Sequence, residues 1–175
     1  MKVFLLILIV CLTVIAGPTS VRQDSAGISE VTLEMAQGEI DIDRPVGRAF
    51  VIILRRDGTA SYEGKANVKL IGKFSGQISE EAFDKLASFL ISRNYSQIRE
   101  VLPHRMSPPA GTGILSAYAG SPVVTTSITR DGKKKMIYRF TSASSGELST
   151  VPKEIIEIEK AIIDAAMKIS WQKVR

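Results

Sequence analysis

The amino-acid sequence predicts an α+β domain, in which an antiparallel sheet built of hairpins is covered on one face by two main helices. Apolar and polar residues alternate on both sides of two Asp-Gly turns, at Asp57-Gly58 and Asp131-Gly132. This pattern is typical of β-hairpins, and an apolar stripe with helical spacing follows each one. Because consecutive hairpins give antiparallel neighbours, we expect one sheet with the element order β-ββ(β)-α-ββ-α.

The chain begins with a segment that is typical of export. An apolar run of 14 residues, Val3–Ala16, follows a lysine and is shorter than the roughly 20 residues of a membrane-spanning helix. We therefore expect a signal peptide over residues 1–20, cleaved after Ala16 or after Ser20, with a retained anchor as the third alternative. A mobile leader, 21–27, and a single α+β domain, 28–175, complete the expected organisation.

The first strands are predicted from alternation with period two, which places every second side chain on the same face. Residues 28–35 form the first expected strand, and residues 49–62 form the first hairpin. We expect its Asp-Gly pair to be a two-residue turn, because both residues tolerate positive φ. Residues 68–74 are expected to add a third strand. The side chains expected in the core are Val31, Leu33, Met35, Phe50, Ile52, Leu54, Ala60 and Tyr62.

A first helix is predicted to begin after Ser79, whose hydroxyl can accept from a free backbone amide. Glu80 and Glu81 follow, at the end of the helix where the dipole favours negative charge. The helix is expected to end at Asn94, and residues 96–102 are expected to form a short further helical turn. Its buried stripe is expected to be Phe83, Leu86 and Leu90.

The second half of the chain begins with a segment that lacks periodicity. Residues 103–122 contain four prolines and three glycines, and irregular segments of this length are usually functional or disordered. Alternation returns over 123–140, which predicts the second hairpin, and a Ser-rich linker follows over 141–149. The last helix is expected to start near Pro152. Its buried stripe is expected to be Ile155, Ile158, Ile162, Ala165 and Ile169.

Several short motifs occur in a fixed order along the chain. They are DGTASYEG (57–64), ISEEAFDKL (78–86), PVVTTSI (122–128), GKKK (132–135) with Tyr138, and a late Trp171. In this order the chain resembles an uncharacterised family of secreted bacterial domains, which carry a D-G-x-x-x-Y-x-G hairpin after a C-x-G-x-C-P-x-Y opening. The cysteine pair of that opening is absent here. The resemblance implies the α+β fold and export, and it implies no functional residue.

Composition argues against several classes of function. The net charge is +5, but the sequence has no basic helix and no interleaving of aromatic with basic residues, so we expect no nucleic-acid binding. The single cysteine, Cys11, lies inside the expected signal peptide. The mature chain would therefore have no thiol nucleophile, thiolate metal site or disulfide. Glu39, Asp41 and Asp43 alternate without the glycine and distal glutamate of an EF-hand, so we expect no metal and no cofactor.

The residues expected to contact a partner lie in two places. His104 and Arg105 belong to the irregular segment 103–122. The second hairpin is basic through Arg130, Lys133, Lys134, Lys135 and Arg139, of which the first four are expected to contact the partner. A basic hairpin can attract an anionic cell-envelope component or a protein partner. The alternative is that its lysines form a solvated edge that discourages strand pairing.

We therefore expect a non-catalytic exported domain, periplasmic or extracellular, that binds an envelope component or a protein partner. No stable membrane span is expected after signal cleavage. The alternative function is a secreted hydrolase with an unrecognised site near the 103–122 segment. His104 is the only histidine, and the sequence offers neither a G-x-S-x-G elbow nor another familiar nucleophile motif beside it.

Export is directly testable. If the apolar segment is a signal peptide, the protein recovered from its native host should begin near Gly17 or Val21. Intact-mass spectrometry of the exported fraction measures this start. Recovery of the chain with Met1 in a soluble cytoplasmic fraction would contradict the prediction.

Overall fold

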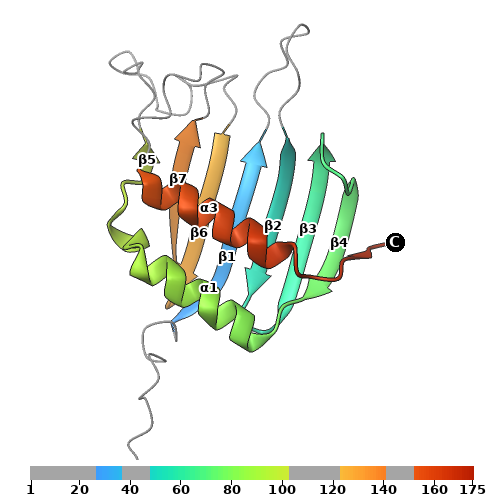
Figure 1. The fold of residues 1–175 in the computed structure, drawn as a ribbon, viewed down its shortest axis with the longest axis horizontal. Helices are drawn as coiled ribbons and strands as arrows, with labels where there is room; N and C mark the ends of the chain where they lie inside the picture. Colours follow the sequence, from blue (N-terminus) through green and yellow to red (C-terminus); the bar gives the residue numbers. More distant parts are fainter. Residues whose placement is uncertain (1–26, 37–47, 103–122, 141–151) are drawn as a thin grey trace, which may run out of the picture.

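A computed structural model describes residues 27–36, 48–102, 123–140 and 152–175. It confirms the α+β class: seven strands are antiparallel to their neighbours and two helices lie on one face (Figure 1). The predicted signal peptide, most of the leader, the 103–122 segment with His104 and Arg105, and the 141–149 linker lie outside the described residues. No helix in the described part of the chain is long and apolar enough to cross a membrane.

The strands are β1 (Ile28–Ala36), β2 (Ala49–Arg55), β3 (Thr59–Ala66), β4 (Gly72–Gln77), β5 (Val101–Leu102), β6 (Val123–Arg130), β7 (Lys133–Phe140) and β8 (Gln172–Lys173). The helices are α1 (Glu80–Ser92), the 3₁₀ turn η1 (Tyr95–Gln97) and α3 (Lys153–Ala166). The strand order across the sheet is β5-β7-β6-β1-β2-β3-β4-β8. The short strand β5 runs parallel to β7, and it is the exception to the antiparallel pattern.

The core lies between the sheet and the two helices. Strand β1 pairs with β2 on one side and with β6 on the other, so that Leu33 faces both Ile52 and Thr126. The expected inward residues are buried: Val31, Leu33 and Leu54 are fully enclosed. Tyr62 and Met35 pack against this cluster and remain partly accessible. The alternation predicted for the first three strands is therefore confirmed.

Helix α1 follows the prediction closely. The Ser79 hydroxyl accepts a hydrogen bond from the Ala82 amide at 3.2 Å, which caps the first turn. The buried side chains are Phe83, Leu86, Ala87 and Leu90. Burial of this single stripe fixes the rotation of α1 on the sheet.

Helix α3 buries a similar stripe and, within it, one charge. Ile155, Ile158 and Ile162 are fully enclosed as predicted, whereas Ile169 lies beyond the end of the helix and is partly exposed. Glu159 is also buried, and its carboxylate accepts two hydrogen bonds from Arg139 of β7, at 2.8 Å and 2.5 Å. This bidentate pair links α3 to the sheet at a defined position.

Two predicted elements differ in the structure. Strand β4 begins at Gly72 rather than at residue 68, because residues 67–71 fold back over β3 at Gly64. The expected helical turn over 96–102 is instead η1 followed by β5. Asn94 adopts a left-handed conformation with φ of 52°, which ends α1. The Tyr95 hydroxyl donates to the Thr126 carbonyl of β6 at 2.7 Å, and the Tyr95 side chain is buried. These contacts hold η1 against the sheet.

The two Asp-Gly turns also differ from each other. Asp131 and Gly132 both have positive φ, and Arg130 pairs with Lys133, as expected of a two-residue turn. In the first hairpin Leu54 pairs with Ala60, so the loop is the three residues Arg56–Gly58, of which only Gly58 has positive φ. The predicted two-residue turn is therefore wrong there. A turn completed by a left-handed glycine is the usual three-residue alternative.

The assigned core can be tested by truncation. We expect Leu86→Ala and Ile162→Ala each to lower the free energy of unfolding by about 2–5 kcal/mol, because both remove a large side chain from a closed core. Ile156 lies on the same helix as Ile162 but is 38% exposed, so Ile156→Ala should change stability by less than about 0.5 kcal/mol. Urea unfolding measures all three. Equal losses for Ile156 and Ile162 would contradict the assigned face of α3.

Candidate functional site

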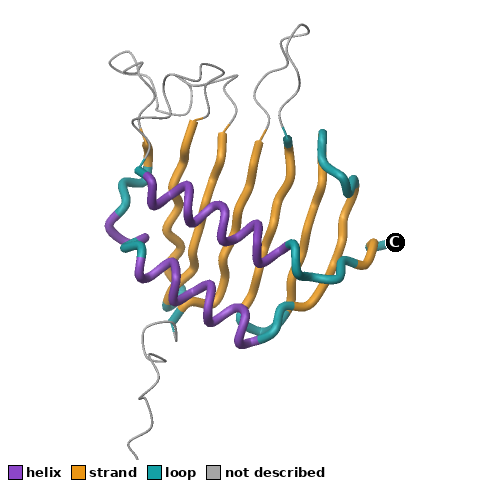
Figure 2. Tube along the Cα trace, viewed as in Figure 1, coloured by secondary structure: helices purple, strands orange, loops and turns teal. Residues whose placement is uncertain are grey.

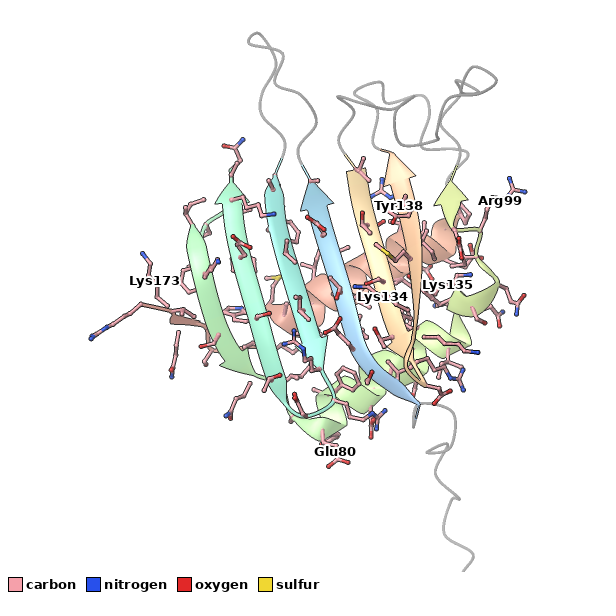
Figure 3. The ribbon with its side chains drawn as sticks, turned by 180° about the vertical axis from the view of Figure 1, so that it is seen from behind. Glu80, Arg99, Lys134, Lys135, Tyr138 and Lys173 are labelled. Atoms are coloured by element: carbon pink, nitrogen blue, oxygen red, sulfur yellow. The ribbon has the colours of Figure 1, made fainter. Side chains whose placement is uncertain are left out.

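The basic residues predicted to contact a partner do not gather into one patch. Along β7 successive side chains alternate between faces, so Lys134 lies on the face without helices and Lys135 on the helix side (Figure 3). The Lys135 ammonium donates to the Ser96 carbonyl at 2.6 Å. Arg130 lies 3.7 Å from Asp131 in an exposed ion pair, and Lys133 is exposed beside the turn. The hairpin therefore offers separate charges rather than a single anion site.

The position of these lysines suits the edge of a sheet. Strand β7 pairs with β6 along its length, but β5 pairs with it only at Tyr138 and Arg139. The outer side of the first half of β7 therefore has no neighbouring strand among the described residues. Charged side chains on an exposed edge discourage pairing with another chain. This is the role that the alternative interpretation of the hairpin expects.

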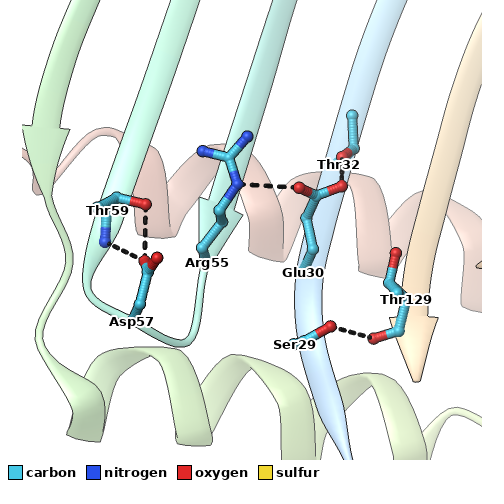
Figure 4. A network of polar contacts seen from close by, with 7 residues as sticks. All are labelled: Ser29, Glu30, Thr32, Arg55, Asp57, Thr59 and Thr129. Carbon is cyan, nitrogen blue, oxygen red and sulfur yellow. Dashed lines mark hydrogen bonds and ion pairs between the residues drawn. The ribbon is translucent and has the colours of Figure 1, made fainter. Parts of the chain in front are cut away.

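A second polar group occupies the helix-free face near the first turn (Figure 4). Arg55 donates to Glu30 at 3.0 Å, and Asp57 accepts from the backbone amide and the hydroxyl of Thr59 at 2.8 Å and 2.6 Å. The hydrogen bond from the Thr59 hydroxyl, and to a smaller extent the one from its backbone amide, lowers the pKa of the Asp57 carboxyl. Each carboxylate thus has partners within the protein, and the described residues contain no cluster of three potential metal ligands.

The candidate site is an apolar pocket on the helix side of β2 and β3, with a volume of about 510 Å³. The inner side chains of these strands form its floor: Phe50, Ile52 and Tyr62. One wall is the end of α3, from Ile163 to Met167, and the opposite wall is the connection between β3 and β4, residues 67–70. Trp171 closes the side between them. Volumes in this range are those of small-molecule sites.

The pocket exists because α3 stops before it crosses β3. Figure 1 shows α3 running from β7 toward β2, and Figure 2 shows that the chain after α3 and the β3–β4 connection are both loops. Neither helix therefore lies over the inner face of β3 beside that connection. The two loops fill part of the space instead, and the volume between them remains open.

Two glycines on the inner face allow these loops to approach the sheet. A Cβ on Gly64 would overlap the Leu70 carbonyl oxygen, so only glycine permits the β3–β4 connection to lie against β3. A Cβ on Gly76 would overlap the Ile169 side chain and lie 3.2 Å from the Trp171 ring. Tyr62, Gly64 and Trp171 are residues of the motifs noted in the sequence. In the structure Tyr62 and Trp171 line one pocket, and Gly64 lies against Leu70 of its wall.

Aromatic rings form much of the lining. The Tyr62 ring lies 6.2 Å from Phe50, 6.0 Å from Phe74 and 5.7 Å from Trp171, measured between ring centroids. The Trp171 indole donates to the Ala166 carbonyl at 3.1 Å, which fixes the ring at the end of α3. The Tyr62 hydroxyl is protonated at neutral pH, as in any tyrosine, and burial raises its pKa further.

The charged residues of the pocket are both cations. Arg48, just before β2, and Lys69, in the β3–β4 connection, belong to the lining and are exposed. Among its described residues, the lining has no aspartate, glutamate, histidine, serine or cysteine. It therefore offers apolar contact and positive charge, without an acid–base pair or a nucleophile of the usual kinds.

Sequence comparison identifies the family of the chain. Residues 48–166, more than half of the protein, match a family described as a domain of unknown function, DUF6438. The chain belongs to this family. No curated protein matches it. The resemblance to an uncharacterised domain family is thus confirmed at this level, while export and the shared motifs remain predictions.

The segment that matches the family model is shorter than the folded domain. The DUF6438 segment begins at Arg48 and ends at Ala166, so it leaves out β1 and Trp171. Yet β1 lies in the middle of the sheet, between β2 and β6. The folded unit of this chain is therefore larger than the matched segment, and part of the pocket lies beyond it.

The pocket residues were missed by sequence analysis as a group. Phe50, Ile52 and Tyr62 were assigned to the core, and Arg48 and Lys69 carried no motif. One sequence feature indicated the pocket wall: Gly64 follows Tyr62 in the expected hairpin, and a glycine within a strand often marks the close approach of another backbone. The sequence does not reveal which segment of the chain makes that approach.

The glycine contacts give a prediction for the pocket wall. Gly64→Ala should lower the free energy of unfolding by about 1–3 kcal/mol, as overpacking does, because the clash is with a backbone carbonyl. Gly76→Ala should cost less, since the closest atom is the end of the Ile169 side chain. Urea unfolding followed by the fluorescence of Trp171, the only tryptophan, measures both. A smaller loss for Gly64→Ala than for Gly76→Ala would contradict this account.

Proposed function

We propose that this chain is an exported, non-catalytic binding domain, and that its ligand places an apolar group in the pocket between β2, β3 and the end of α3. The ligand would be a component of the cell envelope or a part of a protein partner. One observation carries the proposal: the described lining of the pocket consists mostly of aromatic and aliphatic side chains, and it includes no histidine, carboxylate, serine or cysteine. Apolar pockets with few polar groups are typical of ligand binding.

The partly exposed rings support this function. Tyr62 and Trp171 contact the core cluster but are not fully buried, and Met167 at the rim is 78% exposed. A ligand that covered these side chains would remove their apolar surface from water, which is favourable by about 25 cal/mol per Å². The alternative of a hydrolase near residues 103–122 concerns residues outside the described structure and gains no support from the pocket.

An uncharged apolar dye tests the proposal. We expect the purified protein to bind N-phenyl-1-naphthylamine with an increase in dye fluorescence, because the dye matches the apolar lining. Ile163→Gln, within the lining, should weaken binding by at least about tenfold, equivalent to 1.4 kcal/mol. Ile156→Gln, on the same helix but outside the lining, is the matched control and should leave binding unchanged.

Folding of each variant is verified by its thermal unfolding. If Ile163→Gln does not fold, Met167→Gln replaces it, because this side chain lines the pocket and is largely exposed. Absence of dye binding by the wild type, or equal binding by folded pocket and control variants, would refute the proposal.

A further inference from the structure

We infer that the ligand of this pocket is an anionic amphiphile of small-molecule size, with a carboxylate, sulfate or phosphate beside Arg48 and Lys69 and an apolar part against the aromatic lining. The inference rests on the proposed function, because it names the class of ligand that the same pocket would select. It follows from the charges of the lining, from the partners of charged residues elsewhere, and from the shape of the site.

The two cations come from different elements of the pocket. Arg48 leads into β2, which contributes to the floor, and Lys69 belongs to the connection that forms a wall. Both are exposed, as charged groups at the mouth of an apolar pocket should be. An anion at the mouth would be near both cations, while the apolar part of the same molecule reached the rings below.

The charge pairs elsewhere in the described part of the protein provide a comparison for this site. Four arginines are paired with carboxylates: Arg55 with Glu30, Arg56 with Asp84, Arg93 with Glu157 and Arg139 with Glu159. Neither Arg48 nor Lys69 forms an ion pair with a described residue, and the described residues of the lining include no aspartate or glutamate. The site therefore favours an anionic ligand over a neutral or cationic one.

The hydrogen-bonding groups of the pocket also favour an anionic ligand. The Tyr62 hydroxyl stays protonated and can donate, whereas the Trp171 N–H is already used by the Ala166 carbonyl. The described lining thus combines a hydrogen-bond donor and two positive charges with the apolar surface, and it includes no carboxylate that would repel an anion. The finite volume, about 510 Å³, suits a single molecule. We therefore commit to a monomeric amphiphile rather than to a membrane surface.

Competition against the uncharged dye tests the inference. Three molecules with the same alkyl chain are compared below their micellar concentrations: decanoate, 1-decanol and decyltrimethylammonium. We expect decanoate to displace the dye at a concentration at least about tenfold lower than decanol, equivalent to 1.4 kcal/mol, and the cation to be the weakest. The advantage of decanoate should shrink at about 0.5 M salt, because ions screen charges at an exposed mouth.

The variant Arg48→Gln/Lys69→Gln should remove the preference for decanoate and leave the displacement by decanol unchanged. The matched control is Lys65→Gln/Lys73→Gln, which also removes two positive charges from neighbouring strands. Strand alternation places both control lysines on the opposite face. The control should retain the full preference, which separates a local effect from a change in net charge.

The outcomes separate the inference from the proposed function. Dye binding with equal displacement by decanoate and decanol overturns the inference and leaves an apolar pocket, whereas no dye binding overturns both. A preference for decanoate that survives Arg48→Gln/Lys69→Gln also overturns the assignment. A final experiment measures whether the protein sediments with phosphatidylglycerol vesicles. Charge-dependent vesicle binding without displacement by monomeric decanoate would assign the two cations to a membrane surface and overturn the inference.

Discussion

Strand β1 holds the two halves of the sheet together, because the hairpins β2–β3 and β6–β7 each pair with it and not with each other. Its inner residues Val31 and Leu33 are fully enclosed, so it also forms the centre of the core. Without β1 neither helix would find a continuous apolar face. The match to DUF6438 begins after this strand, although the rest of the fold depends on it.

The helix layer is placed by apolar burial and by one charged pair. Arg139 and Glu159 are among the few buried polar residues of the described structure, and each satisfies the other through a bidentate contact. Such a pair contributes little net stability, since both groups lose water, but loss of one partner would leave a buried charge. The pair therefore selects one arrangement of α3 on β7. That arrangement also determines where α3 ends, and hence where the pocket opens.

The pocket arises where the helices do not reach and where loops approach the sheet closely. Gly64 and Gly76 permit that approach, and the indole of Trp171 is fixed by the last carbonyl of α3. The partly buried rings contribute to stability and remain accessible to a ligand. The same side chains can serve the fold and the binding of a ligand. Their buried apolar surface stabilises the fold, and their exposed apolar surface is available to an apolar ligand.

Much of the fold could be predicted from local sequence patterns. Strand alternation around the Asp-Gly turns, the Ser79 cap and the isoleucine stripe of α3 depend on neighbours within a few residues, so the sequence by itself determined these elements and the α+β class. It did not determine the three-residue first turn or the turn at Tyr95, which hydrogen-bond to segments distant in sequence. It also did not determine the start of β4, which depends on the close approach of Leu70 to Gly64. The pocket is likewise a feature that the sequence by itself did not determine. Arg48, Tyr62 and Lys69 belong to one stretch, 48–69, but Trp171 and the end of α3 come from the far end of the chain. Only the tertiary structure brings these parts together, since long-range packing has no local signature in the chain.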